Sequence, residues 1–348
     1  MYKRGLTAAI ALLMLLVGCK KEEKFVDKTT GKPLNIKIIR FDEALFGQKH
    51  TNQTLYFDTL IKDYSDLMDT NIPKKNLYML LSNTVADTIM QQGWKAVNKM
   101  YPSFDWLEKK LNTGFAELQK NYPQTHLPKI YSMISGPIDY QTGYERRVYA
   151  DANCIIIAAD WYAMTILKDK PFYNQIPKYL CKVLDSAYIA ADVIKAYLKQ
   201  VTTINMPLAS MSGDADLLSL MIESGKFNYA AQKLLGCTEQ EVLRYTDKEL
   251  QWCQKNEANI WGYFIQNKLL FEKEPIKYRG LLFDAPSSRG MQGSPARVAE
   301  YIGYRIVCEY AKQNKISIQD LFSLTKAEDI GKEANRILNE SGFKPKKR

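Results

Sequence analysis

Glu257 is the residue whose position in this sequence most directly suggests chemistry. It lies in the stretch from Tyr245 to Phe271, where we expect a helix because apolar residues recur on one face at positions 250, 253, 260, 261, 264 and 269. That face continues through position 257. A carboxylate on an apolar face must accept hydrogen bonds, pair with a cation or take up a proton, because unpaired burial is costly. Glu257 is therefore a candidate acid, base, metal ligand or structural ion-pair partner.

A structural role is the favoured interpretation of Glu257. The predicted helix has no second titrating side chain three or four residues beyond it, as a catalytic pair on one helix face would need. The candidate partners are Arg297, near the start of a later predicted helix, and Arg305, two turns further along it. Arginine suits this role because its planar guanidinium can meet both carboxylate oxygens at once. Asn256 and Trp261 complete the predicted structural or interaction residues.

The other residues with reactive side chains form no recognisable catalytic motif. The chain has 2 His, His50 and His126, in different contexts and without HExxH spacing, so a typical gluzincin or metzincin zinc site cannot be assembled. A GxSxG elbow, a Walker A loop, a CxxC pair and an EF-hand loop are also absent from the sequence. We expect no catalytic residue, no cofactor and no metal. A glycosidase pair of carboxylates stays open, because no spacing singles one out.

The N-terminus predicts export and lipidation. Residues 1–4 are basic, residues 8–17 form a compact apolar run, and the Leu-Val-Gly-Cys sequence at 16–19 has the form of a bacterial lipobox. We therefore expect a signal peptide over 1–18 and a mature chain that starts at an acylated Cys19, with palmitate among its acyl chains. Acyl chains on this residue would hold the protein on a membrane without a spanning helix.

Residues 19–34 follow as a charged, lipidated tether. Lys-Glu-Glu at positions 21–23 looks like the signal that sends some Bacteroidetes lipoproteins to the cell surface. A flexible tether without such a signal is the alternative interpretation. The outer membrane is the expected location, and its periplasmic face and the cell surface both stay open.

Charge and cysteine usage limit the possible partners. The formal net charge of the 348 residues is +10, and removing residues 1–18, whose charges are Lys3 and Arg4, leaves +8. The remaining basic residues are spread along the chain, apart from the tail, so a solvated surface is favoured over a nucleic-acid site. Five cysteines remain beyond Cys19, and this odd number leaves at least one thiol unpaired within the chain.

Hydrophobic periodicity predicts one large α+β domain, mainly α, over residues 35–340, with a basic tail at 341–348. Short strands are expected at 35–41, 129–135 and 153–159. Capping boxes at Thr238 with Glu241 and at Thr246 with Glu249 predict helix starts. Further helices are expected at 56–68, 77–91, 104–122, 176–200, 215–223, 227–235 and 294–313, and from Ser317 and Thr325.

Short motifs along the chain resemble the GldB-type gliding-motility lipoproteins of Bacteroidetes. They include Tyr-Thr at 245–246, Trp-Cys at 252–253, Asn-Glu at 256–257, Ile-Trp at 260–261 and Asn-Lys-Leu-Leu at 267–270. Arg-Phe-Asp at 40–42, Tyr-Ser-Met-Ile-Ser-Gly at 131–136, Gly-Lys at 225–226 and Ser-Pro at 294–295 extend the resemblance over most of the mature chain. Their order is what identifies the family.

The resemblance implies a non-catalytic, membrane-anchored envelope lipoprotein linked to gliding motility and its associated secretion machinery. Other envelope or gliding-machinery proteins would be its partners. The family layout also weakly resembles helical zinc-peptidase domains, with the helix around Asp192 and the segment 222–225 where ligands would lie. This chain has no His there, and Ser224 stands where family members tend to have Glu, so it would be a metal-free relative. The alternative is an envelope hydrolase of peptide or glycan that uses Glu257 as acid or base.

Overall fold

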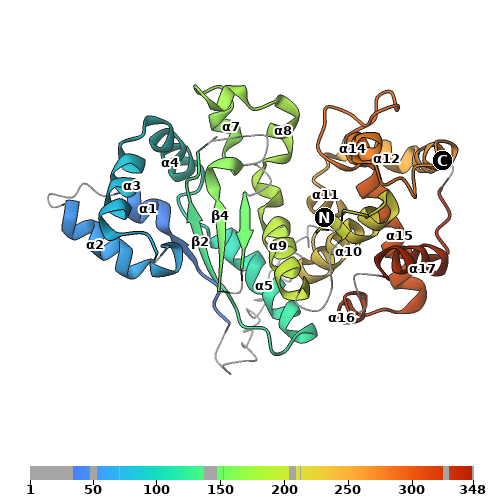
Figure 1. The fold of residues 1–348 in the computed structure, drawn as a ribbon, viewed down its shortest axis with the longest axis horizontal. Helices are drawn as coiled ribbons and strands as arrows, with labels where there is room; N and C mark the ends of the chain where they lie inside the picture. Colours follow the sequence, from blue (N-terminus) through green and yellow to red (C-terminus); the bar gives the residue numbers. More distant parts are fainter. Residues whose placement is uncertain are drawn as a thin grey trace, which may run out of the picture.

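The computed structural model describes residues 34–47, 53–69, 71–136, 147–151, 153–203, 209–211, 213–323 and 329–346. The predicted signal peptide, Cys19, nearly all of the tether and the predicted helix start at Thr325 lie outside these ranges. Helices make up most of the described chain, and one sheet lies in its N-terminal half (Figure 1). The predicted α+β, mainly α fold class is confirmed.

The sheet has four strands in the order β1-β2-β4-β3. β1 (Ile38–Arg40), β2 (Lys129–Met133) and β4 (Cys154–Ala158) run parallel, and β3 (Val148–Ala150) pairs antiparallel with β4 at the edge. Isoleucines pair across the parallel strands, with Ile38 opposite Ile130 and Ile130 opposite Ile155, and all three are buried. β-branched side chains suit such a sheet because they pack well on its pleated surface.

Helices cover the sheet on both sides. Figure 1 shows α1 to α4 on one side of the sheet, and α5 and α9 on the other. The α-helices among the described residues of this half are α1 (Phe41–Phe46), α2 (Gln53–Asp63), α3 (Lys74–Ala86), α4 (Thr88–Met100), α5 (Asp105–Asn121), α7 (Met164–Leu167), α8 (Lys178–Val183) and α9 (Ile189–Thr203). Single 3₁₀ turns occur at η1 (Ser65–Leu67), η3 (Ala159–Tyr162), η4 (Tyr173–Gln175), η5 (Ser186–Tyr188) and η6 (Ala209–Met211).

The C-terminal half is helical and is organised around α10. Its elements are α10 (Leu217–Leu235), α11 (Glu239–Leu243), α12 (Asp247–Lys255), α13 (Glu257–Gln266), α14 (Pro275–Leu282), α15 (Val298–Asn314), α16 (Ile318–Leu321) and α17 (Ile330–Ser341). α10 packs against α5 and α9 on one side and against α15 and α17 on the other. One continuous apolar core therefore joins the sheet layer to the C-terminal helices.

The crossing of α10 and α15 depends on two glycines. A Cβ atom added at Gly225 in α10 would lie 2.4 Å from the carbonyl oxygen of Gly303, and one added at Gly303 in α15 would lie 2.0 Å from that of Met221. Both clashes are with backbone, which side-chain rearrangement cannot relieve. The crossing therefore has room for no side chain at either position.

Several predicted helices are broken in the structure. The expected helix at 77–91 divides into α3 and α4 because the side chain of Asp87 accepts hydrogen bonds from the backbone N–H groups of Ile89 and Met90. In the expected helix at 176–200, Asp185 likewise caps a new turn through the N–H of Ala187. The stretch from Tyr245 to Phe271 breaks at Asn256, whose φ and ψ are −107° and 13°. The side-chain caps at Asp87 and Asp185 compete with helix continuation. Asn256 makes no such cap, and its side chain instead donates to the carbonyl of Trp252.

Other predicted boundaries were also wrong. The two helices expected at 215–223 and 227–235 are one helix, α10, because Gly225 serves close packing against Gly303 and does not end a helix. The helix expected from Ser294 starts at Val298, because Arg297 adopts a left-handed conformation with φ of 59°. β3 and α14 were not predicted. Both capping boxes, the three parallel strands and α5 were predicted correctly.

Candidate functional site

The environment of Glu257 is a closed hydrogen-bonded cluster. Glu257 starts α13 and is 1% exposed. Its Oε2 atom accepts hydrogen bonds from the Tyr301 hydroxyl at 2.8 Å and from Nε of Arg305 at 3.1 Å. Its Oε1 atom accepts one from the backbone N–H of Lys346 at 3.0 Å. Both carboxylate oxygens are therefore engaged, and the side chain ties α13 to α15 and to the segment after α17.

Of the other predicted residues, Arg305 belongs to the Glu257 cluster, Asn256 and Trp261 lie on the same chain segment as Glu257, and Arg297 belongs to a different cluster. Asn256 donates from Nδ2 to the carbonyl of Trp252 at 2.9 Å, and Trp261 packs edge-on against Phe343 at 5.5 Å between ring centroids. Arg305 is the partner of Glu257. Arg297 is not a partner of Glu257, so one of the two candidate pairings was wrong. Arg297 precedes α15 in a left-handed conformation, and its side chain therefore points away from Glu257.

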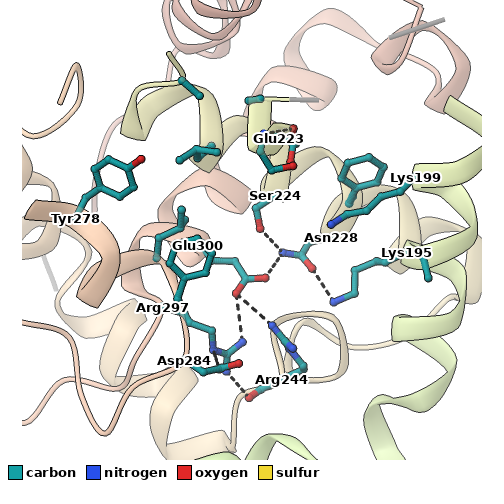
Figure 2. Close-up of a pocket in the computed structure, with 18 of the residues that line it drawn as sticks. Lys195, Lys199, Glu223, Ser224, Asn228, Arg244, Tyr278, Asp284, Arg297 and Glu300 are labelled. Carbon is teal, nitrogen blue, oxygen red and sulfur yellow. Dashed lines mark hydrogen bonds and ion pairs between the residues drawn. The ribbon is translucent and has the colours of Figure 1, made fainter. Parts of the chain in front are cut away.

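A pocket of about 760 Å³ lies between the two halves of the chain, and Arg297 lines it (Figure 2). Its walls come from α9, α10, α14, the start of α15 and the end of α11. The charged lining residues are Arg147, Asp192, Lys195, Lys199, Glu223, Arg244, Lys273, Asp284, Arg297 and Glu300. Asp192 and the middle residues of segment 222–225, Glu223 and Ser224, therefore line the same pocket; the family layout placed both at a ligand site.

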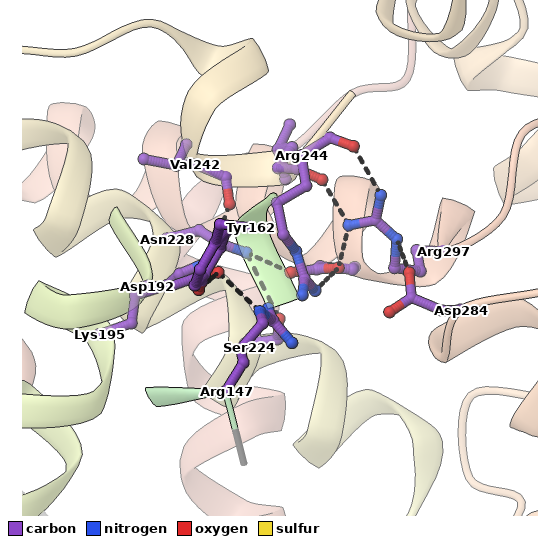
Figure 3. Close-up of polar contacts among 12 residues, drawn as sticks. Arg147, Tyr162, Asp192, Lys195, Ser224, Asn228, Val242, Arg244, Asp284 and Arg297 are labelled. Atoms are coloured by element: carbon purple, nitrogen blue, oxygen red, sulfur yellow. Dashed lines mark hydrogen bonds and ion pairs between the residues drawn. The ribbon is translucent and has the colours of Figure 1, made fainter. Parts of the chain in front are cut away.

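One part of the polar floor is centred on Asp192 (Figure 3). Its Oδ2 atom accepts hydrogen bonds from Nε of Arg147 at 2.9 Å and from the Tyr162 hydroxyl at 2.8 Å. Nζ of Lys195 lies 3.6 Å from Oδ1 and donates to Oδ1 of Asn228 at 3.2 Å. α9 presents Asp192 and Lys195 one turn apart, so the two charges share one helix face.

The other part of the floor is centred on Arg297. Its Nε lies 2.7 Å from Oδ1 of Asp284, and its Nη1 lies 3.2 Å from Oε2 of Glu300. Nη1 and Nη2 also donate to the backbone carbonyls of Leu243 and Arg244, at 2.5 and 2.8 Å. Arg297 thus satisfies the C-terminal end of α11 and fixes it against the start of α15.

These contacts keep the carboxylates of the floor ionised. Burial alone would raise the pKa of each one, but Arg147 holds the pKa of Asp192 below its ordinary value. Arg297 does the same to the pKa values of Asp284 and Glu300. Burial lowers the pKa of Lys195 to about 8, against the opposing charge of Asp192. A carboxylate held in its charged form has no proton to give at neutral pH, so Asp192, Asp284 and Glu300 are suited to holding cations and not to general acid catalysis.

The thiols of the described residues are not activated for nucleophilic chemistry. Cys154, Cys181, Cys237, Cys253 and Cys308 are free, and burial raises the pKa of every one of them. Within the described ranges, His, Cys, Asp and Glu form no group of three that could hold a metal ion. That the purified protein carries no stoichiometric zinc stays a prediction.

Apart from Arg297, sequence reasoning missed the cations of the pocket. Arg147, Lys195 and Arg244 come from three separate segments, and no local motif joins them. Lys195 did carry a signal, since it lies four residues beyond Ala191 on the apolar stripe of its predicted helix. Arg147 and Arg244 carried none, because their burial depends on how α9, α10 and α11 pack together.

Comparison with known protein families identifies the family of this chain. The family model described as gliding motility protein GldB matches residues 21–345. This chain belongs to that family. No curated protein and no solved structure matches it, so the suggested relation to zinc peptidases stays a prediction. None of the helices in the described ranges is long and apolar enough to cross a membrane.

Proposed function

We propose that this protein is a non-catalytic lipoprotein, anchored to the outer membrane through Cys19, that acts by binding other proteins of the gliding and associated secretion machinery. The observation that carries the proposal is the match of the GldB family over residues 21–345, which makes it a gliding-motility-associated envelope protein. The lipobox at 16–19 supplies the anchor, residues 19–34 the tether, residues 35–340 the globular domain and residues 341–348 a basic tail.

The geometry disfavours the alternative of a hydrolase that uses Glu257. A general acid or base needs access to a substrate atom within hydrogen-bond reach. Glu257 is 1% exposed, both its oxygens accept hydrogen bonds from the protein, and it is not among the residues lining the pocket. Incubation of the purified chain with peptidoglycan and with peptides tests this directly: turnover that Glu257→Gln abolishes without unfolding the protein would favour the hydrolase.

Changing Cys19 to Ala is expected to move the protein from the membrane fraction to the soluble fraction, or to leave an unprocessed precursor. The physical reason is that acyl chains each bury many methylenes, at about 0.8 kcal/mol per CH₂. Cell fractionation and immunoblotting measure the result. Cys181→Ala is the matched control, because Cys181 is half-buried and free and should not affect anchoring. Normally processed Cys19→Ala protein in the membrane fraction would contradict the proposed anchor.

A further inference from the structure

Arg244 is the least satisfied cation on the pocket floor. Its Nε atom is buried and donates no hydrogen bond within the described residues. The nearest carboxylate is that of Glu300, whose Oε2 lies 3.8 Å from Nη2 of Arg244. Glu300 is already held by Arg297 at 3.2 Å and by Nδ2 of Asn228 at 2.8 Å. The guanidinium of Arg244 therefore has donors to offer to a bound molecule.

The contrast with Arg297 is one of degree: the Nε atoms of both residues are buried and donate no hydrogen bond within the described residues, but that of Arg297 lies 2.7 Å from Oδ1 of Asp284. Arg297 contacts two carboxylates and two backbone carbonyls, and its guanidinium lies 4.9 Å from the ring centroid of Tyr245. Arg244 ends α11 in a left-handed conformation with φ of 54°, which a non-glycine residue adopts at an energetic cost. That conformation places its side chain in the pocket beside Glu300 and Asn228 (Figure 2).

The rest of the lining favours an anion with an apolar body. Among the described residues that line the pocket, six are Lys or Arg and four are Asp or Glu. Tyr278 and Leu282 of α14 and Phe283 after it form an apolar wall, and Phe227 of α10 lines the pocket as well. Phe283 is 43% exposed, so part of this wall is open to a ligand. A volume of about 760 Å³ lies in the range of sites for small molecules and short peptide segments.

We propose that this pocket binds the carboxylate of a ligand with an apolar body, which Arg244 holds through its free donors while Phe283, the exposed part of the apolar wall, contacts the apolar part. Arginine fits a carboxylate because its planar fork can donate two parallel hydrogen bonds to the two oxygens. The C-terminus of a polypeptide and a free small carboxylic acid share this chemistry. The inference goes beyond the proposed function, and it does not depend on the membrane anchor.

Calorimetry on the full-length protein in detergent tests this, with N-acetyl-leucine and the acetylated peptide Ala-Ala-Ala-Leu as probes, each also as its C-terminal amide. Either both carboxylate probes or the peptide alone should bind. Each amide should bind at least about tenfold more weakly than the carboxylate form of the same probe. A peptide that binds at least about tenfold more tightly than acetyl-leucine identifies a polypeptide terminus; equal affinities identify a small acid. Failure of both carboxylates to bind more tightly than about 1 mM, or equal binding of the amides, would overturn the proposal.

Two variants localise the binding to Arg244. Arg244→Gln should lower the affinity at least about tenfold, whereas Arg336→Gln, in α17 and outside the lining of this pocket, should leave it unchanged. Ser224→Glu places a fixed carboxylate in the same pocket and should lower the affinity similarly, which keeps the test decisive if Arg244→Gln fails to fold. Unchanged affinity in a folded Arg244→Gln or in Ser224→Glu would overturn the assignment.

Discussion

Replacing Glu257 with Gln is expected to lower the free energy of unfolding by about 3 kcal/mol, the effect of breaking a buried ion pair from one side. The substitution preserves side-chain volume, so cavity formation does not contribute. It leaves the guanidinium of Arg305, whose side chain is 15% exposed, without its buried anionic partner. It also gives Tyr301 and the N–H of Lys346 a weaker acceptor. Urea unfolding of the purified chain, followed by tryptophan fluorescence, measures the change.

Glu309→Gln is the matched control for this experiment. Glu309 contacts the same Arg305 at 3.3 Å, but its side chain is 36% exposed, and exposed pairs contribute under about 1 kcal/mol. The expected order is therefore a large effect at position 257 and a small one at 309. Equal effects would show that Glu257 is not held as a buried ion pair. Loss of function in Glu257→Gln at unchanged stability would point instead to chemistry or partner binding.

Replacing Gly303 with Ala is expected to destabilise the fold by about 3 kcal/mol, at the upper end for overpacked cores. The added Cβ atom would lie 2.0 Å from the carbonyl oxygen of Met221, so α10 and α15 would have to move apart. α10 also packs against α5, α9 and α17, and α15 packs against α17. Moving α10 and α15 apart would therefore disturb the packing of those three helices as well. The same unfolding measurement applies.

Gly262→Ala is the control for helix propensity. Gly262 lies inside α13, and a Cβ atom added there would meet nothing within 4 Å. Alanine is the better helix former by about 1 kcal/mol, so this variant should gain stability. Opposite signs at positions 303 and 262 would establish that close packing, and not propensity, explains the glycine in α15. A neutral Gly303→Ala variant would show that the two helices are not in tight contact.

Local signals in the sequence were sufficient for much of the fold. The capping boxes at Thr238 and Thr246 predicted helix starts correctly because a cap needs only residues three positions apart. The breaks at Asp87 and Asn256 were missed, since apolar periodicity continues through both. Gly225 was misinterpreted as a helix end because the sequence cannot show that Gly303 lies against it. β3 has three residues, too few for an alternating pattern to stand out.

The polar sites, like the helices, could be predicted only where the signal is local in the sequence. Arg305 could be named in advance as one of two candidate partners of Glu257, because each of the two residues is a charge on an otherwise apolar helix face. The contacts of Glu257 with the Tyr301 hydroxyl and with the backbone N–H of Lys346 could not be predicted. The contact with Lys346 depends on where the chain runs after α17. The pocket needs Arg147, Asp192 and Arg244 from distant segments, so it emerges only when the helices are packed.

Cross-linking in intact cells, followed by identification of the bound partners, tests the proposed function most directly. A photoreactive residue at Lys199, which is exposed at the pocket, should give adducts with envelope proteins of the gliding or secretion machinery. The same probe at Lys332, on the exposed face of α17, is the control for random collisions. Specific adducts at 199 from the membrane fraction are the result we predict. Adducts that are identical at both positions, or none at either in cells that express the anchored protein, would contradict a role in binding envelope partners.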